Sequence, residues 1–151
     1  MIQDKYIDWQ RATIKAIKDY EDMRFILANY ESQRNDIDDR MTKPGGSNVN
    51  RQPVSGGGDK TEESWAYCID QIVDLESNYS KAKEFISWFT PAWERLSDRE
   101  KIILEEQYMI ERLSGSWEMS AMERLHVERA EIFRLRRRAL ARLSVLLYGP
   151  R

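Results

Sequence analysis

Six arginines lie within the sixteen residues "ERAEIFRLRRRALARL", from Glu128 to Leu143. A guanidinium is always charged in proteins, and its planar fork of N–H groups matches phosphate oxygens and guanine edges. The whole chain has a formal net charge of only −2, but residues 128–151 carry seven arginines and two glutamates, a local charge of +5. Residues 1–127 therefore sum to −7. Because nucleic acid responds to local charge, this segment is a candidate nucleic-acid surface.

Helical spacing, at about 100° per residue, divides the segment into two faces. The apolar face contains Ile132, Leu135, Ala139, Leu143 and Leu146, and is widened by Leu140 and Leu147. The arginines lie elsewhere on the helix. Arg134 and Arg137 point away from the apolar face, and Arg138 flanks them. Arg129, Arg136 and Arg142 lie nearer the buried side. A helix that is merely soluble usually mixes its charges, whereas Glu131 is the one acid after Glu128. The pattern favours contact with DNA or RNA over a plain solvated face.

The residues before this helix predict the elements that would position it. Ser97 and Glu100 have the spacing of a capping box, so a helix should follow in "SDREKIILEEQYMI". Gly115 breaks the chain, a short helix follows over residues 117–125, and "LHVE" forms a turn. The last helix should run from about residue 128 to 148, where Gly149 and Pro150 end it. Residues 93–151 therefore predict a three-helix domain with a helix-turn-helix, whose second helix can enter the major groove of DNA.

Two stretches, "LSDREKIILEEQY" and "MERLHVERAEIFRLRRRALARL", resemble region 4 of the sigma-70 class of transcription initiation factors. The resemblance covers about a third of the chain, and "RALARL", residues 138–143, is its specific part. His126 stands where that family has a glycine in the turn, and Glu128 where it has a hydroxyl residue.

This resemblance implies which residues would contact DNA. The first two turns of the last helix would face the bases with Arg129, Ala130, Phe133 and Arg134. Of these, the two arginines could read base edges, and Phe133 is expected to pack rather than to touch a thymine methyl group. Arg137 and Arg138 would contact phosphates, which supply affinity without sequence information.

The rest of the chain predicts two long helices joined by a loop. Apolar residues recur at helical spacing through residues 1–41 and again through residues 61–92, where Pro91 is expected to end the helix. Residues 42–60 hold five of the seven glycines and two of the four prolines, which predicts a flexible loop. The loop is interpreted as a connection rather than as an arm that touches nucleic acid, although it carries Lys43, Arg51 and Lys60.

Neither apolar stripe can be buried by its own helix. The simplest arrangement is a coiled-coil-like antiparallel hairpin of the two long helices, and pairing between chains in a homodimer is the alternative. The predicted fold is all-α: a long helical hairpin followed by the three-helix domain. This layout also resembles small phage and prophage regulators of the ArpU and RinA kind, which implies a DNA-binding regulator of late phage genes.

Other classes of function find little support in the sequence. The single histidine, His126, lies in the turn, and the single cysteine, Cys68, lies on an apolar stripe. Because catalytic and metal sites need several such side chains close together, we expect no enzyme activity, metal site or cofactor. "NDIDD", residues 35–39, lacks the glycine and final glutamate of a calcium loop. No signal peptide or membrane span is expected, and the chain is predicted to be cytoplasmic in a bacterial host.

The sequence leads to one hypothesis and two alternatives. The leading hypothesis is a sequence-specific regulator of phage or prophage transcription that binds double-stranded DNA, with an N-terminal hairpin that mediates either dimerisation or docking to host RNA polymerase. The first alternative is a DNA-packaging protein of the small-terminase kind, and the second is a helical protein that binds polymerase without touching DNA. The operator, the sign of regulation and the oligomeric state do not follow from the sequence.

Overall fold

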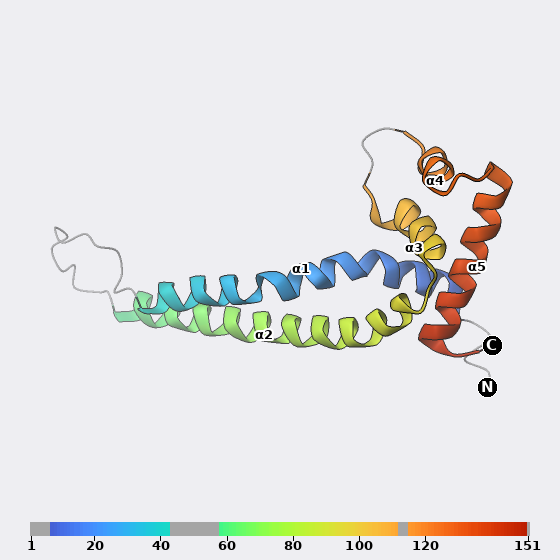
Figure 1. Ribbon diagram of the computed structural model, residues 1–151. Helices are drawn as coiled ribbons and strands as arrows, with labels where there is room; N and C mark the ends of the chain where they lie inside the picture. Colours follow the sequence, from blue (N-terminus) through green and yellow to red (C-terminus); the bar gives the residue numbers. More distant parts are fainter. Residues whose placement is uncertain (1–6, 43–57, 112–114, 151) are drawn as a thin grey trace. The chain divides into compact units, whose positions relative to one another are not determined.

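The computed structural model describes residues 7–42, 58–111 and 115–150 (Figure 1). The described residues form helices and no strand, which confirms the all-α prediction. The helices are α1 (Trp9–Thr42), α2 (Gly58–Glu94), α3 (Asp98–Leu104), α4 (Trp117–Leu125) and α5 (Arg129–Tyr148), and a π-helical segment, Glu105–Met109, continues α3. The loop predicted over residues 42–60 lies outside the described residues except at its ends, where Thr42 and residues 58–60 are helical.

The chain forms two compact units, and each long helix contributes to both. Unit 1 comprises residues 1–23 and 84–151, and unit 2 comprises residues 24–83. Unit 1 therefore contains α3, α4 and α5 together with the start of α1 and the end of α2.

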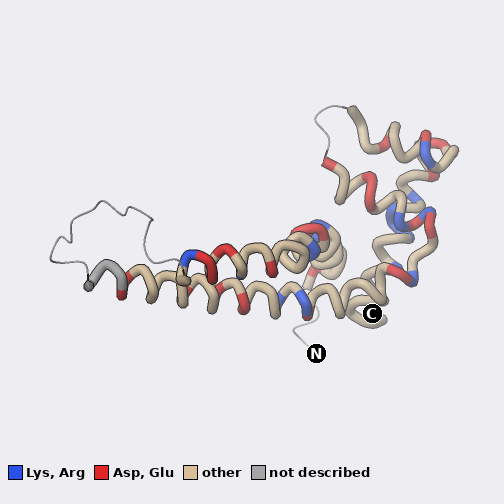
Figure 2. Tube along the Cα trace, turned by 60° about the vertical axis from the view of Figure 1, so that its left-hand side comes forward, with Lys and Arg blue, Asp and Glu red and all other residues tan. Residues whose placement is uncertain are grey.

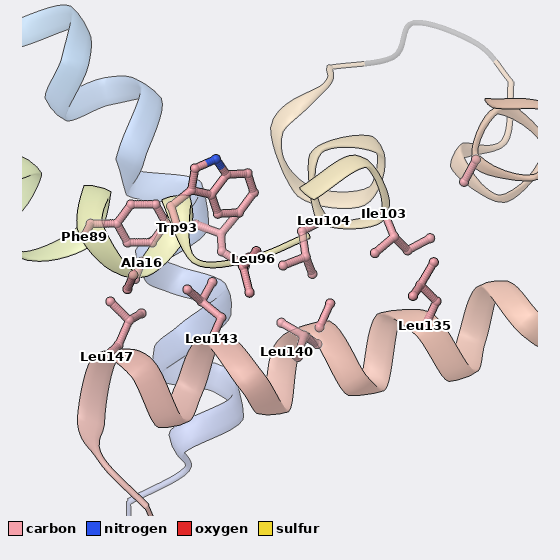
Figure 3. Packing of buried hydrophobic residues seen from close by; sticks show 14 of the residues in the cluster. Ala16, Phe89, Trp93, Leu96, Ile103, Leu104, Leu135, Leu140, Leu143 and Leu147 are labelled. Carbon is pink, nitrogen blue, oxygen red and sulfur yellow. The ribbon is translucent and has the colours of Figure 1, made fainter. Parts of the chain in front are cut away.

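Leucines on one side of α5 form the centre of the core of unit 1. In Figure 3, Leu147 points toward Ala16 of α1, and Leu140 and Leu135 point toward Leu104 and Ile103 of α3. The predicted apolar face is confirmed at Ile132, Leu135, Ala139, Leu140, Leu143 and Leu147, all of which are buried. Leu146 was expected in this set but is 38% exposed.

Helix α2 does not end at Pro91, as the sequence predicted, but continues to Glu94. Proline removes one backbone hydrogen bond and costs a helix interior about 3 kcal/mol. The next two residues, Ala92 and Trp93, are both buried in the core of unit 1. Loss of a buried tryptophan side chain typically costs about 3–5 kcal/mol, so packing of Trp93 offsets the proline penalty.

Unit 2 consists of the remaining parts of α1 and α2, which contact each other in opposite chain directions. The rings of Tyr30 and Tyr79 stack with their centroids 4.1 Å apart. Four residues further along α1, the guanidinium of Arg34 pairs with Glu76 of α2 and lies 3.5 Å from Asp38. Cys68 is buried and free, as the apolar stripe predicted.

Candidate nucleic-acid interface

A left-handed turn at His126 sets the approach from α4 to α5. His126 has φ 54° and ψ 46°, and its N–H bonds to the carbonyl of Met122. This backbone conformation is the one that glycine adopts without steric cost, whereas an L-residue is strained there. Helix α5 begins immediately after Glu128, whose side chain makes no cap hydrogen bond. The turn predicted at "LHVE" is therefore present, with histidine in the glycine position.

The start of α3 is tied to α5 by the predicted capping box. The Ser97 hydroxyl accepts a hydrogen bond from the Glu100 N–H, and Glu100 Oε1 accepts one from the Ser97 N–H at 3.1 Å. The same Glu100 oxygen lies 2.8 Å from Arg142 Nη1 of α5. Burial alone would raise the pKa of Glu100, but the hydrogen bonds from Ser97 and the nearby Arg142 charge hold it below its ordinary value. Arg142 is therefore a structural contact of α3.

An ion pair between a buried glutamate and a partly exposed arginine joins α4 to the π-helical segment. Arg124 Nη1 of α4 lies 2.7 Å from Oε1 of Glu106, whose side chain is almost fully buried. Sequence reasoning missed this pair because the two residues are 18 positions apart and lie on different helices. An acid within an otherwise apolar run, as in "IILEEQY", was the only available signal.

Five of the six predicted DNA-contacting residues lie exposed on α5. They are Arg129, Ala130, Arg134, Arg137 and Arg138. The sixth, Phe133, is half-buried, and its ring meets that of Trp117 edge-on with centroids 5.9 Å apart. The guanidinium groups of Arg129 and Arg136 lie over the Phe133 ring at 5.8 and 5.5 Å. Phe133 therefore packs, as the sequence suggested, and helps to orient Arg129.

Figure 2 shows the basic residues of α5 interspersed with acidic ones from its own and neighbouring helices. Arg129 lies 3.3 Å from Glu118 of α4, and Arg134 and Arg138 share Glu131 at 3.6 and 3.7 Å. Arg137 has no carboxylate partner among the residues that the structure describes. The sequence predicted a basic face with few neighbouring acids. It did not show that Glu118 and Glu100, which belong to other helices, pair with arginines of α5.

These pairs leave the arginines able to bind another anion. The side chains of Arg129, Arg134 and Arg138 are each about two-thirds exposed or more. Exposed ion pairs typically contribute only about 0–1 kcal/mol, so a phosphate can replace the glutamate at little cost. The outer face of α5 is thus an exposed set of guanidinium groups on a helix that is fixed from behind.

No known protein family matches the chain, and neither the curated proteins nor the solved structures contain a similar one. The resemblance to sigma region 4 therefore rests on the residues quoted above. None of the helices in the described part of the chain is long and apolar enough to cross a membrane.

Proposed function

We propose that this protein is a sequence-specific DNA-binding regulator of phage or prophage transcription, acting in the cytoplasm of a bacterial host. The observation that carries the proposal is the division of α5. Four of its five leucines (Leu135, Leu140, Leu143 and Leu147) are buried in unit 1, and five of the six candidate residues are exposed. A helix held in this way can present its outer face to the major groove.

In this proposal α4 and α5 act as a helix-turn-helix, and α1 and α2 form an antiparallel hairpin. The left-handed turn at His126, the short α4 before it and the 20-residue α5 after it support the first part. The stacking of Tyr30 on Tyr79 and the pairing of Arg34 with Glu76 support the second. The resemblance of residues 96–143 to sigma region 4 agrees with both the turn and the exposed arginines.

The proposed contacts divide by chemistry along α5. Arg129 and Arg134 read base edges, most naturally guanine through a bidentate fork. Ala130 lies beside them, and its small side chain lets the helix backbone approach the groove closely. Arg137 and Arg138, one turn further on, contact phosphates.

The decisive experiment is binding to DNA fragments from upstream of the chain's own gene cluster, over a salt series. Neutralised phosphates release counterions, so log K should fall linearly with log salt concentration. The double variant Arg134→Ala with Arg137→Ala should weaken binding, and Phe25→Ser, a change at an exposed residue of unit 2, serves as the control. A slope near zero, or equal affinity for the two variants, would refute DNA binding.

We further propose that the protein forms a homodimer through unit 2. Trp65, Ile69 and Val73 lie on one face of α2 at spacings of four and are 51%, 48% and 58% exposed. At 100° per residue, the centre of this patch lies about a quarter-turn around α2 from Cys68, which is buried, and Tyr79, which stacks on Tyr30 of α1. Apolar patches of this kind commonly mark association surfaces, and a dimer would present two copies of α5 to DNA.

Solution mass tests the dimer and separates the alternatives. Light scattering should give a dimer mass that falls toward the monomer in Ile69→Asp. Lys81→Glu, at an exposed residue on another face of the same helix, should leave the mass unchanged. A closed ring of many subunits would favour the packaging alternative. A monomer that is retained by host RNA polymerase but not by DNA would favour the polymerase-binding alternative.

A further inference from the structure

An apolar cavity of about 460 Å³ lies on the C-terminal half of α5, beside Arg137, which has no carboxylate partner among the described residues. Its walls are the indole of Trp9 from α1 and the side chains of Leu140, Ala141 and Val145 from α5. A cavity of this volume falls in the range that accommodates small molecules. It lies entirely within unit 1.

The wall contributed by α1 is held in place by local contacts. The carboxylate of Asp8 accepts a hydrogen bond from the Arg11 N–H and so caps the helix. The buried Thr13 hydroxyl donates to the Trp9 carbonyl at 2.7 Å. The Trp9 ring also lies against Tyr148, with centroids 4.9 Å apart. The cavity is therefore built from fixed elements.

The polar groups around the cavity indicate the charge of its ligand. Arg137 is the one charged side chain among the described lining residues, and Gln10 and Ser144 add neutral hydrogen-bonding groups. The other candidate arginines are each paired with a glutamate: Arg129 with Glu118, and Arg134 and Arg138 with Glu131. A single cation beside apolar walls suits one negative charge attached to an apolar body, because a second charge would find no partner there.

We propose that this cavity binds an amphipathic monocarboxylate, either a small apolar acid or the C-terminus of a peptide that ends in an apolar residue. Its carboxylate pairs with Arg137, and its apolar body lies against Trp9 and Val145. Where the proposed function holds, the ligand withdraws Arg137 from phosphate and weakens DNA binding. The ligand would then regulate the protein at the edge of its DNA-binding surface.

The proposal can be tested by calorimetry on the full chain without DNA. Octanoate and N-acetyl-Leu-Phe are the two acid probes, and each is compared with its neutral amide. We expect at least one acid to bind about tenfold more tightly than its amide, a difference that reports the ion pair. Tight binding of octanoate indicates a small acid, and binding of the dipeptide alone indicates a peptide C-terminus.

Two variants assign the binding to this cavity. Arg137→Gln should abolish the preference for acid over amide, and Ala141→Phe should weaken both ligands by occupying the cavity. Arg134→Gln, on the same helix, should leave both affinities unchanged, and circular dichroism verifies that each variant is folded. The proposal is overturned if neither acid binds saturably, if acid and amide bind equally, or if Arg134→Gln weakens binding as much as Arg137→Gln does. Since DNA is absent, failure here leaves the DNA-binding proposal untouched.

Discussion

The two units bury their apolar residues to very different extents. Unit 1 packs segments of five helices around fully buried side chains such as Phe89, Ile103, Leu104 and Leu143. In the described part of unit 2, two helices bury Ile37, Cys68 and Ala82, while Trp65, Ile69 and Val73 remain about half exposed. Two helices can cover only one face of each other, so the second face of α2 remains available. Unit 1 therefore derives its stability from its own core, whereas unit 2 has apolar surface left for a partner.

The largest expected effect is loss of a core leucine in unit 1. Leu143→Ala should lower the free energy of unfolding by about 3–4 kcal/mol, because it leaves a cavity among rigid neighbours, whereas Ile37→Ala in unit 2 should cost about 2 kcal/mol or less. Urea denaturation followed by circular dichroism measures both. Equal losses would show that the two helices of unit 2 pack as tightly as the core of unit 1.

The next effect concerns affinity rather than stability. The double variant Arg134→Ala with Arg137→Ala should lose about 1–3 kcal/mol of DNA-binding free energy, since it removes one base reader and one phosphate contact. The urea midpoint should not move, because both side chains are exposed. Fluorescence anisotropy with labelled DNA measures the loss, and a shift of the midpoint would instead assign these arginines to the scaffold.

The pH dependence of stability should depend on Glu100. Its pKa is lowered in the folded state, so its contribution is fully present above about pH 5 and is lost as the pH falls through the folded pKa. Glu100→Gln should lower the free energy of unfolding by about 1–2 kcal/mol at neutral pH, because it removes a charge-assisted hydrogen bond. It should also make the free energy of unfolding less dependent on pH at acidic pH. Unfolding curves between pH 3 and 7 test this, and Glu76→Gln in unit 2, at a more exposed pair, is the control. An unchanged acid limb would contradict the role of Glu100.

The smallest effect is a gain. His126→Gly should stabilise unit 1 by about 0.5–1 kcal/mol, because glycine adopts the left-handed conformation without a clash. Part of the gain is offset because glycine gives the unfolded chain more conformational freedom. Differential scanning calorimetry should show a small rise in Tm, whereas Ser144→Gly, within α5, should lower it. A fall in Tm for His126→Gly would mean that the imidazole makes a stabilising contact.

Periodicity and capping signals predicted the helices because they act over a few residues. The Ser97 capping box, the turn at residues 125–128 and the buried leucines of α5 all follow from local spacing. The errors concern competition between local and distant interactions. Pro91 was expected to end α2, but burial of Trp93 in a core made by distant segments outweighs the proline.

The candidate site was predictable in its residues but not in its charge balance. The six candidate residues of α5 follow from the resemblance to sigma region 4, and all except Phe133 are exposed. Two acids from other helices pair with arginines of α5: Glu118 of α4 lies 11 positions before Arg129, and Glu100 of α3 lies 42 positions before Arg142. A single sequence carries no signal for such pairs, nor for the cavity between Trp9 and Val145, which lie at opposite ends of the chain.

The tryptophans are distributed unevenly between the units, which makes the protein's own fluorescence informative. Of the five, four belong to unit 1, where Trp93 is buried, and Trp65 alone belongs to unit 2. In the monomer, emission from Trp65 should be red-shifted and readily quenched by iodide, and it should shift to the blue when the proposed dimer covers this residue. Emission from Trp93 should be blue-shifted and protected in both states. Subtracting the spectrum of Trp65→Phe from that of the wild type therefore isolates an optical signal from the exposed stripe of α2 without any added label.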